Sequence, residues 1–176
     1  MEAKSYKECL NKITTFIFDV DGVLTDGTVT VTTSGEMLRT MNIKDGYAIK
    51  TAIDNGYHIC IISGGSNLGV RIRLQGLGVK DIYLGVHDKI ETLKEYINNH
   101  GIVASNAIYM GDDIPDLKAM QLVGLPCCPQ DAAPEIKAVS LYISHKNGGK
   151  GAVRDVIEQV MKVQGKWNKN FDAKYD

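Results

Sequence analysis

This sequence has almost no excess of one sign of charge, and it has no long apolar run. The 20 Lys and Arg residues nearly balance the 21 Asp and Glu residues, which leaves a formal net charge of -1 at pH 7. Because no overall field attracts nucleic acid or an anionic membrane, recognition has to be local. No run approaches the roughly 18 apolar residues of a membrane span, and the polar residues 1–12 contain no signal-peptide core. We therefore expect a cytoplasmic protein that binds neither nucleic acid nor membrane.

Cysteine and histidine are few and form no metal-binding pattern. The four cysteines include no C-x-x-C pair, and no histidine stands at zinc-ligand spacing. Cys60, Cys127 and Cys128 lie in apolar segments, where cysteine usually behaves as a small buried hydrophobic residue. We expect reduced thiols without a redox role, and no histidine is a catalytic candidate.

The length of 176 residues and the 44% hydrophobic share fit one globular domain over residues 1–176. Apolar runs typical of buried strands alternate with segments of helical period. The expected strands are residues 14–20, 57–63, 81–85, 106–111, 124–128 and 138–144. After a short N-terminal helix, the expected helices are residues 45–56, 67–77, 89–101, 114–122 and 152–163. This alternation predicts an α/β fold with a doubly wound, mostly parallel, Rossmann-like sheet.

One segment interrupts the alternation of strands and helices. Residues 28–41 show Val and Thr at a period of two, followed by a Thr-Ser-Gly-Glu turn, which predicts a β-hairpin inserted after the first strand. Because an isolated hairpin is marginally stable, it should pack either on another subunit or back on its own domain. The sequence leaves both alternatives open. The polar tail, residues 166–176, is expected to fray.

Polar residues able to carry chemistry follow the first, second, third and fourth expected strands. The carboxyl ends of parallel strands meet at one edge of an open sheet, and ligands bind beyond that edge. We therefore expect these side chains to face one crevice. The candidates are Asp19, Asp21, Ser63, Gly64, Lys89, Asp112, Asp113 and Asp116.

These residue types together predict a phosphoryl site that uses Mg²⁺. Neighbouring carboxylates repel each other by about 1 kcal/mol per pair in water at ~4 Å, and by more in a partly dry crevice, so they need a cation. Oxygen ligands favour Mg²⁺, which leaves positions open for phosphate oxygens. Lys89 adds an ammonium group, and Ser63 adds a hydroxyl on a Gly-rich turn whose backbone N–H groups can bind an anion.

The two acids at the end of the first strand can divide the reaction between them. Asp19 would attack phosphorus, and Asp21 would protonate the leaving alkoxide and later activate water. Each motif is weak alone, since paired acids often form a solvated rim and Gly-Asp-Asp can simply cap a helix. The order of these motifs, each at the end of a successive strand, is what favours a phosphoryl site over these simpler explanations. Two rivals are a phospho-receiver domain, which accepts phosphate after its third strand, and a non-catalytic scaffold built on the hairpin.

Four segments resemble the motifs of the haloacid dehalogenase superfamily of phosphotransferases, in the same order. They are DVDGVLTDG at residues 19–27, Ser63, Lys89 and GDDIPD at residues 111–116. The resemblance implies that Ser63 and Lys89 bind the phosphoryl group. Members with large caps insert them after the first motif or between the second and third. Since the first gap holds only the hairpin and the other holds one helix and one strand, the resemblance implies a member without a cap domain.

The same resemblance implies roles for the acidic residues. Asp19 would be the nucleophile and a Mg²⁺ ligand. Asp21 would be the acid/base and, through its backbone carbonyl, a second ligand. Asp112 would be a third ligand, and Asp113 and Asp116 would support these ligands without binding the ion.

Within the capless group, further segments resemble the family of 3-deoxy-D-manno-octulosonate 8-phosphate phosphatases. The segments are VDGVLTDG, the hairpin, NIKDGYAIK, ISGG, LGVKDIYLGVHDK and GGKGAVRD. The resemblance implies hydrolysis of that sugar-acid phosphate in lipopolysaccharide synthesis. It also implies a homotetramer assembled through the hairpins, in which the Gly-rich segment at about residues 146–151 closes a neighbour's site. Gly148, Gly149 and Lys150 are then lid candidates, and the alternative is a plain solvent loop.

A sugar acid carries a carboxylate, which a guanidinium fork would bind. The resemblance points to Arg73, with Arg71 as the alternative, and either could also be a surface charge. The full set of substrate-binding candidates is Arg73, Gly64, Lys44, Asp45, Gly148 and Lys150. Related phosphatases of nine-carbon sugar-acid 9-phosphates carry Glu and Lys where this chain has Gly65 and Gly76. Their absence favours the eight-carbon substrate and keeps the nine-carbon one as the alternative.

Overall fold

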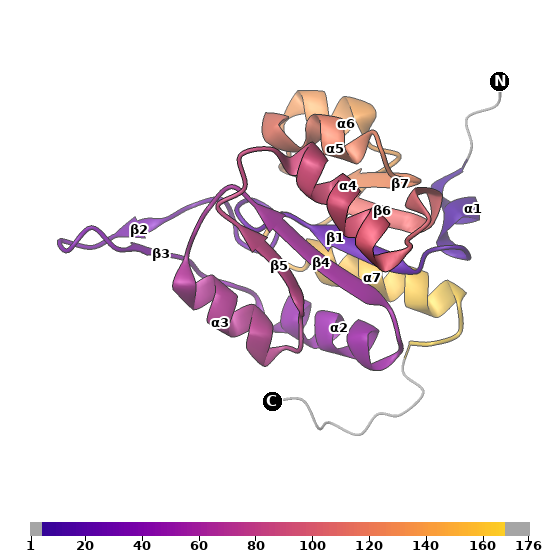
Figure 1. The fold of residues 1–176 in the computed structure, drawn as a ribbon, viewed down its shortest axis with the longest axis horizontal. Helices are drawn as coiled ribbons and strands as arrows, with labels where there is room; N and C mark the ends of the chain where they lie inside the picture. The colour runs from indigo at the N-terminus through magenta and orange to yellow at the C-terminus, as the bar shows by residue number, and fades with distance from the viewer. Residues whose placement is uncertain (1–4, 168–176) are drawn as a thin grey trace.

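A six-stranded parallel sheet forms the centre of the computed structural model, which describes residues 5–167 (Figure 1). The strands lie in the order β5-β4-β1-β6-β7-β8, and every neighbouring pair is parallel. Their bounds are β1 Thr15–Phe18, β4 His58–Ser63, β5 Asp81–Leu84, β6 Ala107–Met110, β7 Leu125–Cys128 and β8 Tyr142–Ile143. This confirms the predicted doubly wound α/β fold.

Helices cover both faces of the sheet, which explains why its strands read as continuous apolar runs. One face packs against α1 Tyr6–Leu10, α2 Ile43–Asp54, α3 Leu68–Gly76 and α7 Ala152–Val163. The other packs against α4 Lys89–His100, α5 Leu117–Met120 and α6 Pro134–Val139. Successive β1 residues point to opposite faces, so Phe16 and Phe18 enter the first core and Ile17 enters the second.

Two of the expected elements differ in the structure. The helix expected at residues 114–122 is a 3₁₀ turn, η2 Ile114–Asp116, followed by the short α5; a second 3₁₀ turn, η1 Ala104–Asn106, precedes β6. The strand expected at residues 138–144 is wrong in its first half, because α6 runs to Val139 and leaves β8 only two residues. Pro134 begins α6 and Ile136 is buried, so helix packing outweighs the β-like alternation of this segment.

The hairpin predicted within residues 28–41 is present as β2 Thr30–Val31 and β3 Met37–Leu38, paired antiparallel. It extends away from the sheet (Figure 1). Its large apolar side chains are between 42% and 64% exposed, namely Val29, Val31, Met37 and Leu38. The structure therefore does not show the alternative in which the hairpin folds back on its own domain. Packing on another subunit stays a prediction.

The remaining expectations concern the cap, the cysteines and the tail. Between β1 and α2 the described chain inserts only the hairpin, and between β4 and β5 only α3, which confirms the absence of a cap domain there. Cys60, Cys127 and Cys128 are buried free thiols, as predicted. Across residues 5–167, no helix has the length and apolarity that crossing a membrane requires. Most of the tail expected to fray, residues 168–176, lies outside the described residues.

Candidate active site

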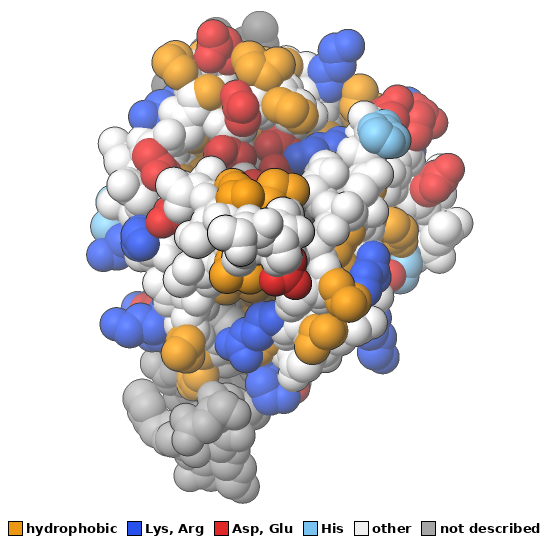
Figure 2. Space-filling model, turned by 90° about the vertical axis from the view of Figure 1, so that its left-hand side faces the viewer, with side chains coloured by type: hydrophobic (Ala, Val, Ile, Leu, Met, Phe, Trp, Pro, Cys, Tyr) orange, Lys and Arg blue, Asp and Glu red, His pale blue; other side chains and the backbone are white. Residues whose placement is uncertain are grey.

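The carboxyl ends of β1, β4 and β6 surround a crevice of about 310 Å³. It lies where the winding of the sheet reverses between β1 and β6, the usual place for a ligand in such a fold. Figure 2, which views the molecule from the side of the hairpin, shows acidic side chains gathered in a hollow beside it. The crevice brings together eight of the predicted residues: Asp19, Asp21, Ser63, Gly64, Lys89, Asp112, Asp113 and Asp116.

Lys89 lines the crevice and joins two carboxylates. Its Nζ lies 2.8 Å from Asp19 Oδ2 and 2.7 Å from Asp116 Oδ1, and its side chain is only 7% exposed. Burial alone would lower the pKa of Lys89, but the two carboxylates outweigh it and raise that pKa. Asp88 accepts hydrogen bonds from the backbone N–H groups of Ile90 and Glu91, which fixes the start of α4 and thus Lys89.

Asp19 follows β1 directly and is nearly buried. Its backbone N–H donates to the Met110 carbonyl, which extends the pairing with β6, and its Oδ1 accepts a 2.6 Å hydrogen bond from the Val20 N–H. Burial, with repulsion from Asp116, raises the pKa of Asp19 to about 6, although Lys89 opposes the shift. The Asp19 carboxylate is therefore held in one orientation, but Lys89 does not fully balance its negative charge.

Asp116 uses both of its oxygens inside the protein. Oδ1 accepts from Lys89 and from the Tyr109 hydroxyl at 2.9 Å, and Oδ2 accepts from the Asp112 N–H at 3.3 Å. The side chain is 1% exposed. Asp116 therefore orients Lys89 and the Asp112 backbone, and its role as a support for metal ligands stays a prediction.

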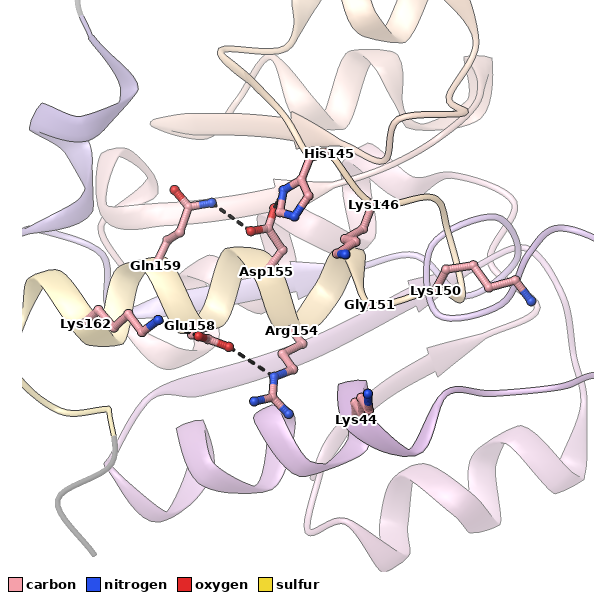
Figure 3. Close-up of a pocket in the computed structure, with 10 residues that line it drawn as sticks. All are labelled: Lys44, His145, Lys146, Lys150, Gly151, Arg154, Asp155, Glu158, Gln159 and Lys162. Atoms are coloured by element: carbon pink, nitrogen blue, oxygen red, sulfur yellow. Dashed lines mark hydrogen bonds and ion pairs between the residues drawn. The ribbon is translucent and has the colours of Figure 1, made fainter. Parts of the chain in front are cut away.

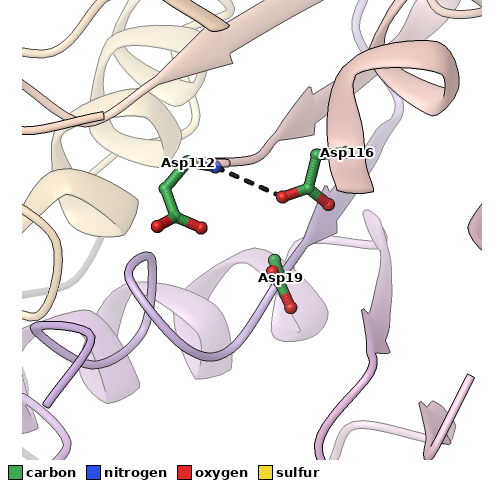
Figure 4. A group of neighbouring side chains, drawn as sticks. All are labelled: Asp19, Asp112 and Asp116. Carbon is green, nitrogen blue, oxygen red and sulfur yellow. Dashed lines mark hydrogen bonds between the residues drawn. The ribbon is translucent and has the colours of Figure 1, made fainter. Parts of the chain in front are cut away.

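Asp112 completes a cluster suited to a cation. One carboxylate oxygen each from Asp19, Asp112 and Asp116 lies within 4.8 Å of the others, and the three side chains converge (Figure 4). Burial, followed by repulsion from Asp19 and the neighbouring acids, raises the pKa of Asp112 to about 7. A Cβ at Gly22 would overlap this carboxylate, so the DVDG motif needs glycine there, at a φ of +84°. The hard oxygen donors and excess negative charge fit a divalent ion.

Ser63 and Asp113 occupy different parts of the crevice wall. Ser63 ends β4, is 2% exposed, and accepts a 3.3 Å hydrogen bond from the Gly65 N–H, so its hydroxyl proton stays available to a ligand. Asp113 caps the 3₁₀ turn through the Ile114 N–H at 2.8 Å. It therefore orders the segment after Asp112.

Asp21 has a partner that the sequence analysis missed. Arg39, from the end of the hairpin, donates from Nε to Asp21 Oδ1 at 2.7 Å and from Nη2 to Asp21 Oδ2 at 3.0 Å. A single arginine beside an expected hairpin gives no signal of such a contact, because most arginines on hairpins face solvent. Only the path of the chain after β3 brings Arg39 to Asp21.

The structure does not bring the other substrate-binding candidates into this crevice. Lys44 and Lys150 line a separate cavity of about 730 Å³ beside the start of α7, with Lys146, Arg154 and Lys162 (Figure 3). Binding of the substrate by Lys44 and Lys150 therefore stays a prediction.

The two arginine candidates lie on α3, also away from the crevice. Arg73 packs against Gly46 of α2, where a Cβ would come within 2.7 Å of its Nη2. Arg71 donates to the Ile82 carbonyl at 3.3 Å. Neither of them lines the crevice of its own chain.

Asp45 caps a helix in the structure. It is fully buried, and its Oδ1 accepts a 2.7 Å hydrogen bond from the Arg154 N–H in the first turn of α7. Its Oδ2 has no hydrogen-bond partner among the described residues. Burial raises the pKa of Asp45 to about 6 against the opposing helix-end hydrogen bonds. The side chain is thus committed to joining α2 to α7.

The Gly-rich segment before α7 is packed against the loop that follows β1. A Cβ at Gly148 would overlap the Gly22 carbonyl, and the Gly149 N–H donates to the Val23 carbonyl at 2.9 Å. Within one chain these glycines are therefore neither a free lid nor a plain solvent loop. They support the backbone that carries the DVDG motif.

The sequence is similar to those of known hydrolases and phosphatases. The sequence profile of haloacid dehalogenase-like hydrolases matches residues 78–157. The 3-deoxy-D-manno-octulosonate 8-phosphate phosphatase KdsC of Salmonella typhi is 36% identical over 85% of this chain and 80% of its own length. The Haemophilus influenzae protein of that name is 32% identical over 89% of this chain and 87% of its own length.

Solved structures are also similar over nearly the whole chain. The phosphatase from Yersinia pestis has a TM-score of 0.91 at 31% identity and covers 95% of this chain and 90% of its own. The phosphatase from Moraxella catarrhalis, solved with magnesium, phosphate and KDO, has a TM-score of 0.89 at 34% identity, covering 92% of this chain and 93% of its own. Identity at this level over most of both chains shows that the protein belongs to the 3-deoxy-D-manno-octulosonate 8-phosphate phosphatase family of haloacid dehalogenase-like hydrolases.

Proposed function

We propose that the protein hydrolyses 3-deoxy-D-manno-octulosonate 8-phosphate to the free sugar acid and inorganic phosphate, for lipopolysaccharide synthesis in the cytoplasm. The observation that carries the proposal is the buried contact of Asp19 with Lys89, next to Asp112 at the switch point of the sheet. Relatives bearing this name cover most of the chain, and one was solved with magnesium, phosphate and KDO.

The reaction would proceed in two displacements at phosphorus. A carboxylate oxygen of Asp19 attacks, the bond from phosphorus to the sugar oxygen breaks, and Asp21 gives that oxygen a proton. Water then attacks the aspartyl phosphate, Asp21 takes a proton from it, and phosphate leaves as the Asp19 carboxylate is restored. Splitting the hydrolysis in this way suits phosphate monoesters, whose uncatalysed hydrolysis is among the slowest reactions enzymes accelerate.

Residues around Asp19 would hold the phosphoryl oxygens. The Lys89 ammonium already contacts the nucleophile, so it can bind a phosphoryl oxygen and Asp19 together. Ser63 and Gly64 line the same crevice, so the Ser63 hydroxyl and the Gly64 backbone N–H would donate further hydrogen bonds. Such fixed donors stabilise charge in the transition state more than mobile water does.

The proposed magnesium ligands are the carboxylates of Asp19 and Asp112 and the backbone carbonyl of Asp21. The raised pKa values of Asp19 and Asp112 support this, because they reflect buried negative charge that Lys89 alone does not balance. A bound Mg²⁺ ion would neutralise charge on the phosphoryl oxygens and favour ionised Asp19. Asp116 and Asp113 would keep the ligands in place through the contacts described above.

A homotetramer assembled through the hairpins would complete the proposal. The exposed apolar side chains of the hairpin support it, because such residues are stabilised when another subunit covers them. In an assembly of this kind, the segment around Gly148 would close a neighbour's site. Arg73, Lys44 and Lys150 would remain candidates for binding the substrate. Asp45 would act indirectly, by holding the start of α7.

Phosphate release from eight- and nine-carbon sugar-acid phosphates tests the proposed activity. We expect Mg²⁺-dependent turnover with preference for the eight-carbon 8-phosphate, lost on Asp19→Asn in a protein that still folds. Asp54→Asn, an exposed acid at the end of α2, is the matched control and should retain full activity. Unchanged turnover in Asp19→Asn would remove the nucleophile assignment, and a stable acyl phosphate without turnover would favour the receiver-domain alternative.

A further inference from the structure

We infer that Arg39 is a positioning residue for Asp21, and that through it the hairpin controls the acid/base group of the crevice. The inference deepens the proposed function and rests on the acid/base role given there to Asp21. Arg39 belongs to the segment after β3, so the group that orients Asp21 comes from the hairpin and not from the sheet.

The contact has the geometry of a fork. Nε and Nη2 of Arg39 donate separately to the two oxygens of Asp21, at 2.7 and 3.0 Å. Two parallel hydrogen bonds fix both the position and the plane of a carboxylate, which a single ammonium group cannot do. In the described part of the chain, no other side chain hydrogen-bonds to the Asp21 carboxylate. Its orientation therefore depends on Arg39.

The pair also differs from an ordinary surface ion pair. The Arg39 side chain is only 8% exposed, although the hairpin around it is open to solvent, and that of Asp21 is 36% exposed. Exposed pairs usually contribute little because both side chains remain mobile. Here the guanidinium is covered and donates three hydrogen bonds, to the two Asp21 oxygens and the Met37 carbonyl, while the carboxylate still opens to the crevice.

Neighbouring residues hold Arg39 in place. Its Nη1 donates to the Met37 carbonyl at 3.1 Å, and Asn67 Nδ2, at the start of α3, donates to the same carbonyl at 3.1 Å. Gly65 leaves room for the guanidinium, because a Cβ there would lie 3.4 Å from Nη2 and 3.1 Å from Asp21 Oδ2. The base of the hairpin is thus anchored to the loop that follows Ser63.

The anchoring of the hairpin connects the assembly of subunits to the acid/base role of Asp21. Met37, whose carbonyl receives Arg39, has an exposed side chain on the hairpin. A subunit that covers the hairpin would restrain β3 and with it the guanidinium two residues later. Because an acid or base works only within reach of its proton, a loosened Asp21 would lower the rate without weakening substrate binding.

A double-mutant cycle tests the inference, using Arg39→Gln, Asp21→Asn and the double variant. Rates are measured with Mg²⁺ on the sugar-acid phosphate and on p-nitrophenyl phosphate. The better leaving group of the latter removes the need for an acid in the first displacement, so Asp21 acts there only as the base that activates water. We expect Arg39→Gln to lower kcat on the sugar-acid phosphate by about 10- to 100-fold with little change in KM. In the Asp21→Asn background, the same change should alter the rate by less than about 2-fold.

Controls separate positioning from folding and assembly. Glu95→Gln, which changes an exposed charge on α4 away from the hairpin, should leave rates and oligomeric state unchanged. Arg39→Lys, which retains charge but not the fork, should recover only part of the rate, and it replaces Arg39→Gln in the cycle if that variant does not fold or assemble. An equal loss with and without Asp21, or a raised KM at unchanged kcat, would overturn the inference. If the sugar-acid phosphate is not a substrate, the cycle on p-nitrophenyl phosphate still decides the role of Arg39.

Discussion

Replacing Lys89 by methionine tests the electrostatics of the crevice. The substitution keeps most of the side-chain volume but removes the Nζ that lies 2.8 Å from Asp19 and 2.7 Å from Asp116. Both carboxylates are nearly buried, so they would face each other without a counter-charge. Breaking a buried ion pair from one side costs about 3–5 kcal/mol, because the partner charge is left without compensation. We expect that loss in the free energy of unfolding at pH 8 without Mg²⁺.

The matched control is Lys94→Met. Lys94 Nζ lies 2.7 Å from Glu91 Oε1, almost the same distance, but the two side chains are 52% and 60% exposed. Exposed pairs contribute about 0–1 kcal/mol, so this variant should remain close to the wild type. Urea unfolding of both variants measures the difference directly.

The pH dependence of the Lys89→Met variant has a definite sign. Burial and Asp116 already raise the pKa of Asp19 to about 6, and loss of Lys89 would raise it further. An acid whose pKa is higher in the native state destabilises that state once it ionises, so the loss should shrink as pH falls from 8 towards 5. Mg²⁺ should also recover part of it. A loss at pH 8 no larger than that of Lys94→Met would refute the reasoning.

Three further predictions concern the parts around the crevice. Burial raises the pKa of Asp45 to about 6, so its ionised carboxylate increasingly destabilises the native state as pH rises from about 4 to above 6. Over that range, the free energy of unfolding of Asp45→Asn, measured in urea, should exceed that of the wild type by up to about 3 kcal/mol. No such difference would contradict the raised pKa. Gly148→Ala should cost about 1–3 kcal/mol in urea unfolding, since its Cβ meets the Gly22 carbonyl; wild-type stability would show that the loop can move. Met37→Ser with Leu38→Ser should reduce the oligomer mass in light scattering at unchanged core stability, whereas an unchanged mass would exclude the hairpin as the interface.

Much of the fold was predictable because local sequence and global packing agree. Strands buried on both faces are continuous apolar runs, as in β1 and β6, and each motif stands where such a run ends. The rule that ligands bind beyond the carboxyl ends of strands then gathered Asp19, Lys89 and Asp112 correctly.

What the sequence could not show depends on contacts between distant segments. The fork from Arg39 to Asp21 spans 18 residues and is set by the path of the hairpin. The contact of Asp45 with Arg154 spans 109 residues, so a residue expected to bind substrate is found capping a helix. Helix α6 was missed because its last two residues, Ala138 and Val139, begin the alternating run that predicts a strand.

The most direct test of the account is to trap the covalent intermediate. Enzyme mixed with ³²P-labelled sugar-acid phosphate and Mg²⁺ is quenched in acid within one turnover, and the labelled peptide is then mapped. The account predicts label on Asp19, which forms an ion pair with Lys89 and has a carboxylate oxygen within 4.8 Å of one from Asp112. It predicts no label in Asp19→Asn. Label on another residue, or full single-turnover phosphate release without any labelled protein, would contradict it.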